Sequence, residues 1–256
     1  MIGKFIIAAA LAATSLAACN SANAGSQKHS SSSHNTSVSV YRSGETQIVG
    51  SGVVVEENRN IPAFGALAID GPVDVVIRQG APSLRLVAED NIIGLIEARK
   101  DGDTLSLATE GSFRTKKPII AYLSVPDLRE VTINASGDVR LEGWDAPALS
   151  LSIRGSGDIE IDGSVDDIRA RIGGSGDIDL APVRVTRVDA AINGSGDVAI
   201  GSVDRLVASI NGSGDIRAGD VGELSADVNG SGDISYRSAR VITRREVNGS
   251  GDIRAR

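Results

Sequence analysis

The chain has 256 residues, of which 41% are hydrophobic and only 3% aromatic, with 30 glycines and a formal net charge of -7. This length suits one sizeable domain with accessory segments, and the scarcity of aromatic residues favours a thin core of stacked aliphatic side chains. The acidic charge, with arginines scattered rather than clustered, excludes nucleic acid as an expected partner, because nucleic-acid-binding proteins neutralise phosphates with basic surfaces.

Residues 1–24 have the features of an export signal, in which the apolar stretch Phe5–Ala18 is too short to span a bilayer. Two cleavage routes are open. Leu16–Cys19 resembles the signal of bacterial lipoproteins, with Cys19 as the lipidated N-terminus, whereas Ala22–Ala24 fits ordinary signal peptidase. We favour lipidation, because Cys19 is the only cysteine in the chain. We therefore expect an exported protein of the cell envelope, periplasmic or anchored at the outer membrane, whose mature domain has no disulfide.

Residues 25–45 are rich in serine and poor in apolar residues. Such a segment buries too little surface to offset its ordering entropy, so we expect a flexible tether. His29 and His34 are the only histidines, and we interpret them as solvated tether residues rather than as metal ligands. Serine nucleophile chemistry is not expected, because no histidine base lies outside the tether.

Residues 46–130 contain short runs of branched apolar residues separated by Gly, Pro, Asn or Asp, a pattern typical of β-strands with turns between them. Asn91–Lys100 is the one segment that suits a helical turn or two. No strict repeat is visible here, so we expect irregular β coils that cap the next region, because a bare terminal coil would expose its core and an unpaired edge. The expected strands are Val53–Val55, Val73–Ile77, Leu84–Val87, Leu105–Leu107 and Ile119–Val125.

Residues 131–256 are organised by a repeat in which Ser-Gly-Asp, followed by Ile or Val, recurs with its serines 18 to 20 residues apart. This period is typical of one coil of a solenoid. Apolar residues alternate within each repeat, as in Val188, Ala190 and Ile192, which is the pattern of a strand with one buried face. The sequence therefore predicts an all-β protein whose residues 46–256 form a single right-handed parallel β-solenoid with about 19 residues per coil.

The residues of the repeated motif divide between the inside and the outside of this solenoid. If the alternation continues through the motif, both glycines lie where a side chain is excluded, either by the opposite wall or by a positive φ. Asn, Ser and Asp then face outward and form columns along the stack, beginning with Asn134. The candidate surface residues are Asp138, Asp158, Asp177, Asp197, Asp215, Asp233, Asp252, Asn193, Asn211, Asn229 and Asn248.

The aspartate column needs a cause, because stacked like charges repel by about 1 kcal/mol per pair in water. Three causes are open. The carboxylates accept backbone N–H bonds in the glycine-containing bend, as in an Asx-turn, which we favour. Alternatively they bridge calcium between coils, although Asp comes one residue early compared with calcium-binding nonapeptide repeats. Otherwise they form a binding surface for polysaccharide or another envelope component. Stacked asparagines are expected to form a hydrogen-bonded ladder.

The last repeat departs from its predecessor, because Thr243 and Arg245 stand where the previous repeat has Leu224 and Ala226. Charge placed along a terminal strand blocks association between sheet edges. We therefore expect a monomer.

Phe64–Ile69, Val73–Val75, Val125–Val131 and the Gly-Ser-Gly-Asp coils, taken as an ordered set, resemble the bacterial head-GIN-domain family of putative auto-transporter adhesins. The resemblance covers about residues 61–256. It implies a β-solenoid on an exported, often lipid-anchored protein, and it supplies no catalytic residues.

We therefore predict a non-enzymatic structural or adhesin-like module of the cell envelope, tethered to the membrane and presenting a regular Asn/Ser/Asp surface, with no cofactor. The expected partners are the membrane, through a lipid anchor, and an envelope polysaccharide or another protein. One alternative is a calcium-dependent or polysaccharide-binding module. Another is a polysaccharide-active enzyme, which would need two carboxyls about 6.5–9.5 Å apart in an inverting mechanism, but the repeats carry no inserted loops that could form a cleft.

Overall fold

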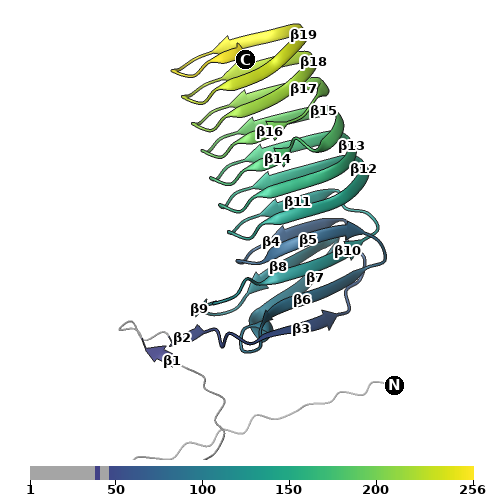
Figure 1. Cartoon of the computed structure of the whole chain (residues 1–256), viewed down its shortest axis with the longest axis vertical. Coiled ribbons are helices and arrows are strands. Elements are labelled where there is room, and N and C mark those ends of the chain that lie inside the picture. The colour runs from purple at the N-terminus through teal and green to yellow at the C-terminus, as the bar shows by residue number, and fades with distance from the viewer. Residues whose placement is uncertain (1–37, 41–45) are drawn as a thin grey trace, which may run out of the picture. The chain divides into compact units, whose positions relative to one another are not determined.

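The computed structural model describes residues 38–40 and 46–256 of the chain. The predicted export signal, most of the tether, and with them Cys19, His29 and His34, lie outside these residues. The chain divides into units of residues 1–34 and 35–256, and all described residues belong to the second. This part is all β except for one 3-10 turn, and it contains the predicted parallel β-solenoid of about seven coils with about 19 residues each (Figure 1).

Each regular coil contributes strand to two faces. Face A holds the strands that lead into the Asn-Gly-Ser-Gly-Asp bends, and face B holds the strands that follow them. Some strands continue around the corner from face B to face A without a break. The strands of the regular coils are β11 (Glu130–Ile133), β12 (Val139–Ile153), β13 (Ile159–Ile172), β14 (Ile178–Leu180), β15 (Val183–Ile192), β16 (Val198–Ile200), β17 (Val203–Ile210), β18 (Ile216–Val228), β19 (Ile234–Val247) and β20 (Ile253–Ala255).

The core is built from equivalent side chains stacked in register. On face A, Ile168 pairs with Val188 and Val188 with Leu206 in neighbouring parallel strands. On face B, Ile178 pairs with Val198. All five are buried, and burying one such side chain fully contributes about 1.5–3 kcal/mol. Because no single coil can cover its own apolar side, stacking of coils supplies the stability.

The N-terminal region also forms coils, in an order that differs from the order of the chain. Leu67 of β4 pairs with Val131 of β11, and Val75 of β5 pairs with Val139 of β12, so β4 and β5 form the coil next to the regular stack. Strands β8 and β10 pair with β4 and β5 and form the next coil, β6 and β7 follow in antiparallel orientation, and β3 pairs with β6.

The strands of this region are β3 (Val54–Arg59), β4 (Ala66–Ile69), β5 (Asp74–Gln79), β6 (Ser83–Glu89), β7 (Ile96–Asp101), β8 (Thr104–Thr109) and β10 (Ile120–Val125). A separate three-stranded sheet contains β1 (Val38–Val40), β2 (Thr46–Val49) and β9 (Phe113–Arg114). These strands form irregular β coils that precede the regular stack. Within the described residues, no helix is long and apolar enough to cross a membrane.

The helical turns expected over Asn91–Lys100 are reduced to a single 3-10 turn, η1 (Ile93–Leu95), followed directly by strand β7. Ile92, Ile93 and Ile96 are all buried. They cluster in the sequence because they fill a corner of the core between β6 and β7, and not because they form the apolar face of a helix.

The alignment of the last repeat is corrected by one residue. A register shift between Leu224 and Ser225 places Ile242, rather than Thr243, opposite Leu224. The Thr243 hydroxyl donates instead to the Leu224 carbonyl at 3.1 Å. Arg245 lies opposite Ala226, as expected.

Candidate functional site

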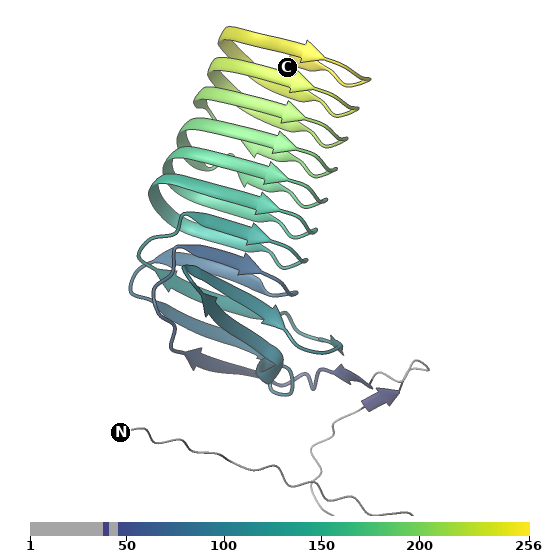
Figure 2. The same ribbon diagram turned by 180° about the vertical axis from the view of Figure 1, so that it is seen from behind.

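The Asn-Gly-Ser-Gly-Asp bends stack along one edge of the solenoid, between faces A and B, and we call this edge the polar ridge (Figure 2). Its glycines are required by the stacking of one bend on the next. A Cβ added to Gly174 would overlap the carbonyl oxygen of Gly155, and one added to Gly176 would overlap that of Gly157. The glycines with positive φ among the described residues lie elsewhere. The expectation of an opposite wall or a positive φ is therefore wrong, and close approach of the neighbouring coil is the reason.

The aspartates of the polar ridge form a continuous ladder between coils. The backbone N–H of Asp177 donates to Oδ1 of Asp158 at 2.7 Å, and that of Asp197 donates to Oδ1 of Asp177 at 2.7 Å. The carbonyl of Asp177 in turn accepts a hydrogen bond from the N–H of Ile159 at 2.9 Å. The same carboxylate contact recurs along the ridge for Asp74, Asp138, Asp197, Asp215 and Asp233, each with the next aspartate.

This ladder corrects the favoured explanation of the column. The carboxylates do accept backbone N–H bonds, but the donor belongs to the next coil and not to the same bend. The exception is Asp252 of the last coil, whose Oδ1 accepts from the N–H of Ile253. A hydrogen bond to a charged group contributes about 1.5–3 kcal/mol, which exceeds the repulsion of about 1 kcal/mol between stacked carboxylates. The aspartates are therefore explained by the structure of the ridge itself.

Arginines partner the carboxylates of the C-terminal half of the ladder. Arg217 contacts Asp197 at 2.7 Å and Asp215 at 2.8 Å, and Arg254 contacts Asp233 at 2.9 Å. The hydrogen bond that Arg217 donates to Asp197 and the charges of the neighbouring aspartates raise the pKa of Arg217. These ion pairs offset part of the like-charge repulsion.

Near the other end of the ladder lies a shallow depression of about 310 Å³, whose charged lining residues are Asp74, Asp138, Asp158, Glu160 and Arg140. Burial raises the pKa of Asp74, and the charge of Asp138 adds to the effect, although a backbone hydrogen bond from Asp138 acts in the opposite direction. Within the described residues, no group of three or more His, Cys, Asp or Glu side chains is arranged to hold a metal ion.

The asparagines form the predicted second ladder. The side-chain amide of Asn211 donates to Asn193 at 3.1 Å, that of Asn229 to Asn211 at 3.3 Å, and that of Asn248 to Asn229 at 3.1 Å. The amide groups are thus largely engaged with one another. The serines of the ridge are exposed, as are the asparagines, but the serines are not part of either ladder.

Sequence reasoning missed two members of these columns, Asp70 and Asp74. Asp74 accepts the N–H of Asp138 at 3.1 Å, and Asp70 accepts the side-chain amide of Asn134 at 2.7 Å. The signal was present, because Asp70-Gly71-Pro72-Val73-Asp74 has the spacing of Asn-Gly-Ser-Gly-Asp.

Sequence reasoning also missed the buried carboxylate of Glu89, which nothing in the pattern of the sequence marks. Glu89 is fully buried and accepts backbone N–H bonds from Gly52 at 2.6 Å and from Lys116 at 2.9 Å. A Cβ on Gly50 would overlap this carboxylate. Glu89 therefore fastens the segment that enters the solenoid to its N-terminal coils.

Comparison with known proteins identifies the class of this solenoid. The family model described as "putative auto-transporter adhesin, head GIN domain" matches residues 63–256. The chain belongs to this family, as the resemblance over residues 61–256 implied. A search of curated proteins gives no match.

Solved structures share the fold. A putative adhesin from Bacteroides fragilis is 22% identical, with a TM-score of 0.75 over 82% of this chain and 100% of the other. A structure from Parabacteroides distasonis, named a putative lipid binding protein, is 19% identical, with a TM-score of 0.66 over 82% and 99% of the two chains. A putative adhesin from Parabacteroides merdae is 17% identical, with a TM-score of 0.58 over 82% and 99%.

Proposed function

We propose that this protein is a non-enzymatic, adhesin-like module of the cell envelope, attached to the membrane through Cys19 and displaying its solenoid to a partner outside the membrane. Membership of an adhesin-named family over residues 63–256 carries this proposal. The Ser-rich residues 25–45 would then act as the spacer between the lipid anchor and the solenoid.

The chemistry of the polar ridge supports a binding module rather than an enzyme. Its carboxylates accept backbone hydrogen bonds, several of them also pair with arginines, and its asparagine amides bond to one another. Groups engaged in this way hold the coils in register and are poorly suited to exchange protons with a substrate. The exposed serines have no histidine base in the solenoid.

The anchoring is tested by expressing the full-length chain in a bacterial host and separating membrane from soluble fractions. Wild-type protein is expected in the membrane fraction, and the Cys19→Ala variant in the soluble fraction. Membrane partition that is unchanged by this substitution would contradict lipid anchoring.

The adhesive role is tested with cells that express the wild-type chain, by measuring their retention on surfaces coated with bacterial envelope material. Retention is expected to exceed that of otherwise identical cells that do not express the chain. Equal retention would contradict the adhesive role.

A further inference from the structure

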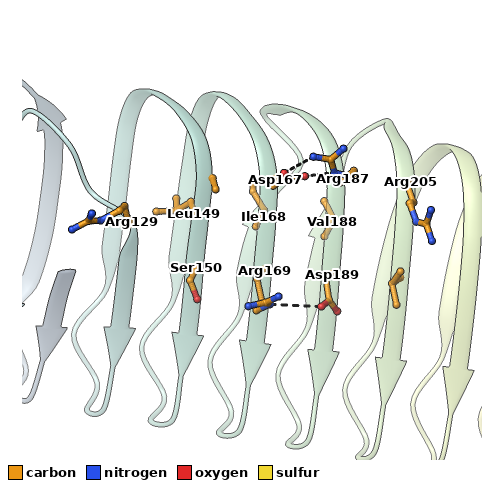
Figure 3. Close-up of a pocket in the computed structure, with 12 residues that line it drawn as sticks. Arg129, Leu149, Ser150, Asp167, Ile168, Arg169, Arg187, Val188, Asp189 and Arg205 are labelled. Atoms are coloured by element: carbon orange, nitrogen blue, oxygen red, sulfur yellow. Dashed lines mark hydrogen bonds and ion pairs between the residues drawn. The ribbon is translucent and has the colours of Figure 1, made fainter. Parts of the chain in front are cut away.

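Face A carries a groove that the polar ridge does not share. It crosses strands β12, β13, β15 and β17 and has a volume of about 510 Å³ (Figure 3). The groove is hollow at β12 because the outward residues there are the small Ala148 and Ser150, whereas longer side chains stand at the equivalent positions of the next coils. We call it the arginine groove, after the residue type that dominates its lining.

The residues that line the arginine groove carry a positive net charge on an acidic protein, and Asp103 and Glu223 beside the lining offset part of it. Its lining contains four arginines and two aspartates, a net charge of +2 (4 minus 2), whereas the whole chain has a net charge of -7. The charged lining residues are Arg129, Arg169, Arg187, Arg205, Asp167 and Asp189.

Two of these arginines are already engaged. Arg187 forms two hydrogen bonds with Asp167, which Figure 3 shows at the upper edge of the groove, and Arg129 is paired with Asp103. The pairing with Asp167 raises the pKa of Arg187. These two side chains therefore help to shape the groove, and their charges are largely compensated.

Arg169 and Arg205 keep their donors available. Arg169 is 3.7 Å from Asp189, whose carboxylate is held more closely by Arg171 at 2.8 Å, and Arg205 is 3.7 Å from Glu223. At these distances neither arginine makes a hydrogen bond with the described residues. Their side chains are 66% and 56% exposed. Two guanidinium groups thus face solvent from coils two steps apart.

We propose that the arginine groove binds an acidic polysaccharide, whose carboxylate groups pair with Arg169 and Arg205. Guanidinium groups recognise carboxylates through paired N–H donors. Asp189 and Ser150 supply acceptors beside these donors, so the lining also suits a ligand rich in hydroxyl groups.

Other polyanions fit this surface less well. An acidic peptide would gain most by adding a strand to a sheet edge, but β13, β15 and β17 are paired on both sides. A lipid surface favours several exposed large apolar side chains, and within the described part of the chain the groove has one, Val207. The assignment rests on the proposed function, because it names the class of ligand that the adhesin-like module would bind.

The test is titration calorimetry of the purified full-length protein with polygalacturonate, a polymer that carries a carboxylate on each sugar. Binding is expected, and it should weaken with added salt, since exposed charges are screened. The variant with both Arg169→Gln and Arg205→Gln should bind at least about tenfold more weakly, because loss of about 1.4 kcal/mol is a tenfold change. Its thermal unfolding should match the wild type, which excludes misfolding as the cause.

The matched control carries Arg237→Gln and Arg240→Gln. Its two arginines are also loosely paired, at 3.3 and 4.0 Å, and 67% and 79% exposed, but lie outside the groove. Equal weakening in this control would overturn the proposal. So would absence of binding to polygalacturonate, equal binding of neutral dextran, tighter binding of polyglutamate, or tighter binding of phosphatidylglycerol vesicles by the Cys19→Ala variant, which has no lipid anchor of its own. Envelope retention of cells by a protein that does not bind polygalacturonate would overturn the groove assignment and leave the adhesive role standing.

Discussion

The N-terminal coils and the regular coils have the same two-faced cross-section but differ in the bends that join the faces. In the regular coils, Gly176 and its equivalents are stacked directly on the bend beneath and leave no room for a Cβ. In the β4–β5 coil, the equivalent bend has Pro72 and Val73, and Val73 is buried with its side chain in place. The coil beneath it turns through the longer connection 110–119. The glycines are therefore a consequence of bend stacking, whereas the carboxylate ladder, which includes Asp74, is common to both regions.

The largest effect is expected from Gly174→Ala, which places a methyl group on the carbonyl oxygen of Gly155. Neither of the two bends can move away without disturbing the strands of its own coil. The free energy of unfolding should therefore fall by about 3 kcal/mol. Gly173→Ala is the matched control, because the nearest atom to its Cβ would be the carbonyl oxygen of Ile153 at 3.8 Å. Urea unfolding of both variants measures the difference, and equal stabilities would refute the role of bend stacking.

In the N-terminal region, Glu89 is the residue whose substitution should destabilise the structure most. Glu89→Ala removes the acceptor of the Gly52 and Lys116 N–H groups, and leaving such donors buried and unpaired costs about 2 kcal/mol. We expect hydrogen exchange to accelerate first around residues 50–53 and 116, while the regular coils stay protected. Glu89→Gln keeps one acceptor and should have a smaller effect. If hydrogen exchange accelerates equally over the whole solenoid, the N-terminal region does not open independently of the regular coils, and the expectation is wrong.

The ladder itself is tested by two substitutions of Asp177. Asp177→Ala leaves the N–H of Asp197 without its acceptor and should lower the free energy of unfolding by about 1.5 kcal/mol. Asp177→Asn retains an acceptor oxygen in the same position and should lie nearer to the wild type. If chemical denaturation finds the Asn variant as unstable as the Ala variant, the charge rather than the hydrogen bond is responsible.

The smallest effect is a dependence on pH at Asp74. Since the pKa of Asp74 is raised in the folded state, its contribution to stability is present below the ordinary aspartate pKa and is lost as pH rises through the raised value. Asp74→Asn should therefore match the wild type at low pH and be slightly more stable at pH 7. Thermal unfolding of both proteins across this pH range measures the difference in stability. If Asp74→Asn is less stable than the wild type at pH 7, the pKa of Asp74 is not raised in the folded state.

The regular coils could be predicted from the sequence because each repeat presents the same alternation, so that Val188, Ala190 and Ile192 reveal a buried face without knowledge of any partner. The stacking order of β4, β8 and β10 could not, since strand pairing between coils depends on tertiary contacts that short apolar runs do not encode. The ridge columns were also predictable in position.

The partners of the ridge residues could not be predicted. An Asp beside two glycines fits a local turn equally well, and only the separation between coils decides that the donor to Asp158 is the N–H of Asp177. The arginine groove was missed for a different reason. The residue types at its outward positions, which include Arg169 and Arg205, differ from repeat to repeat. The repeat pattern therefore does not mark these residues as neighbours on one face.

The most direct test of the central claim, that the aspartate column is a hydrogen-bonded ladder between coils, is the thermal unfolding of wild type and Asp177→Ala with calcium and with a chelator. The ladder predicts that the melting temperature of each protein is the same in both conditions, with Asp177→Ala lower throughout. A wild-type melting temperature that rises steeply with calcium, and that does not rise in Asp177→Ala, would contradict the ladder and assign the column to calcium.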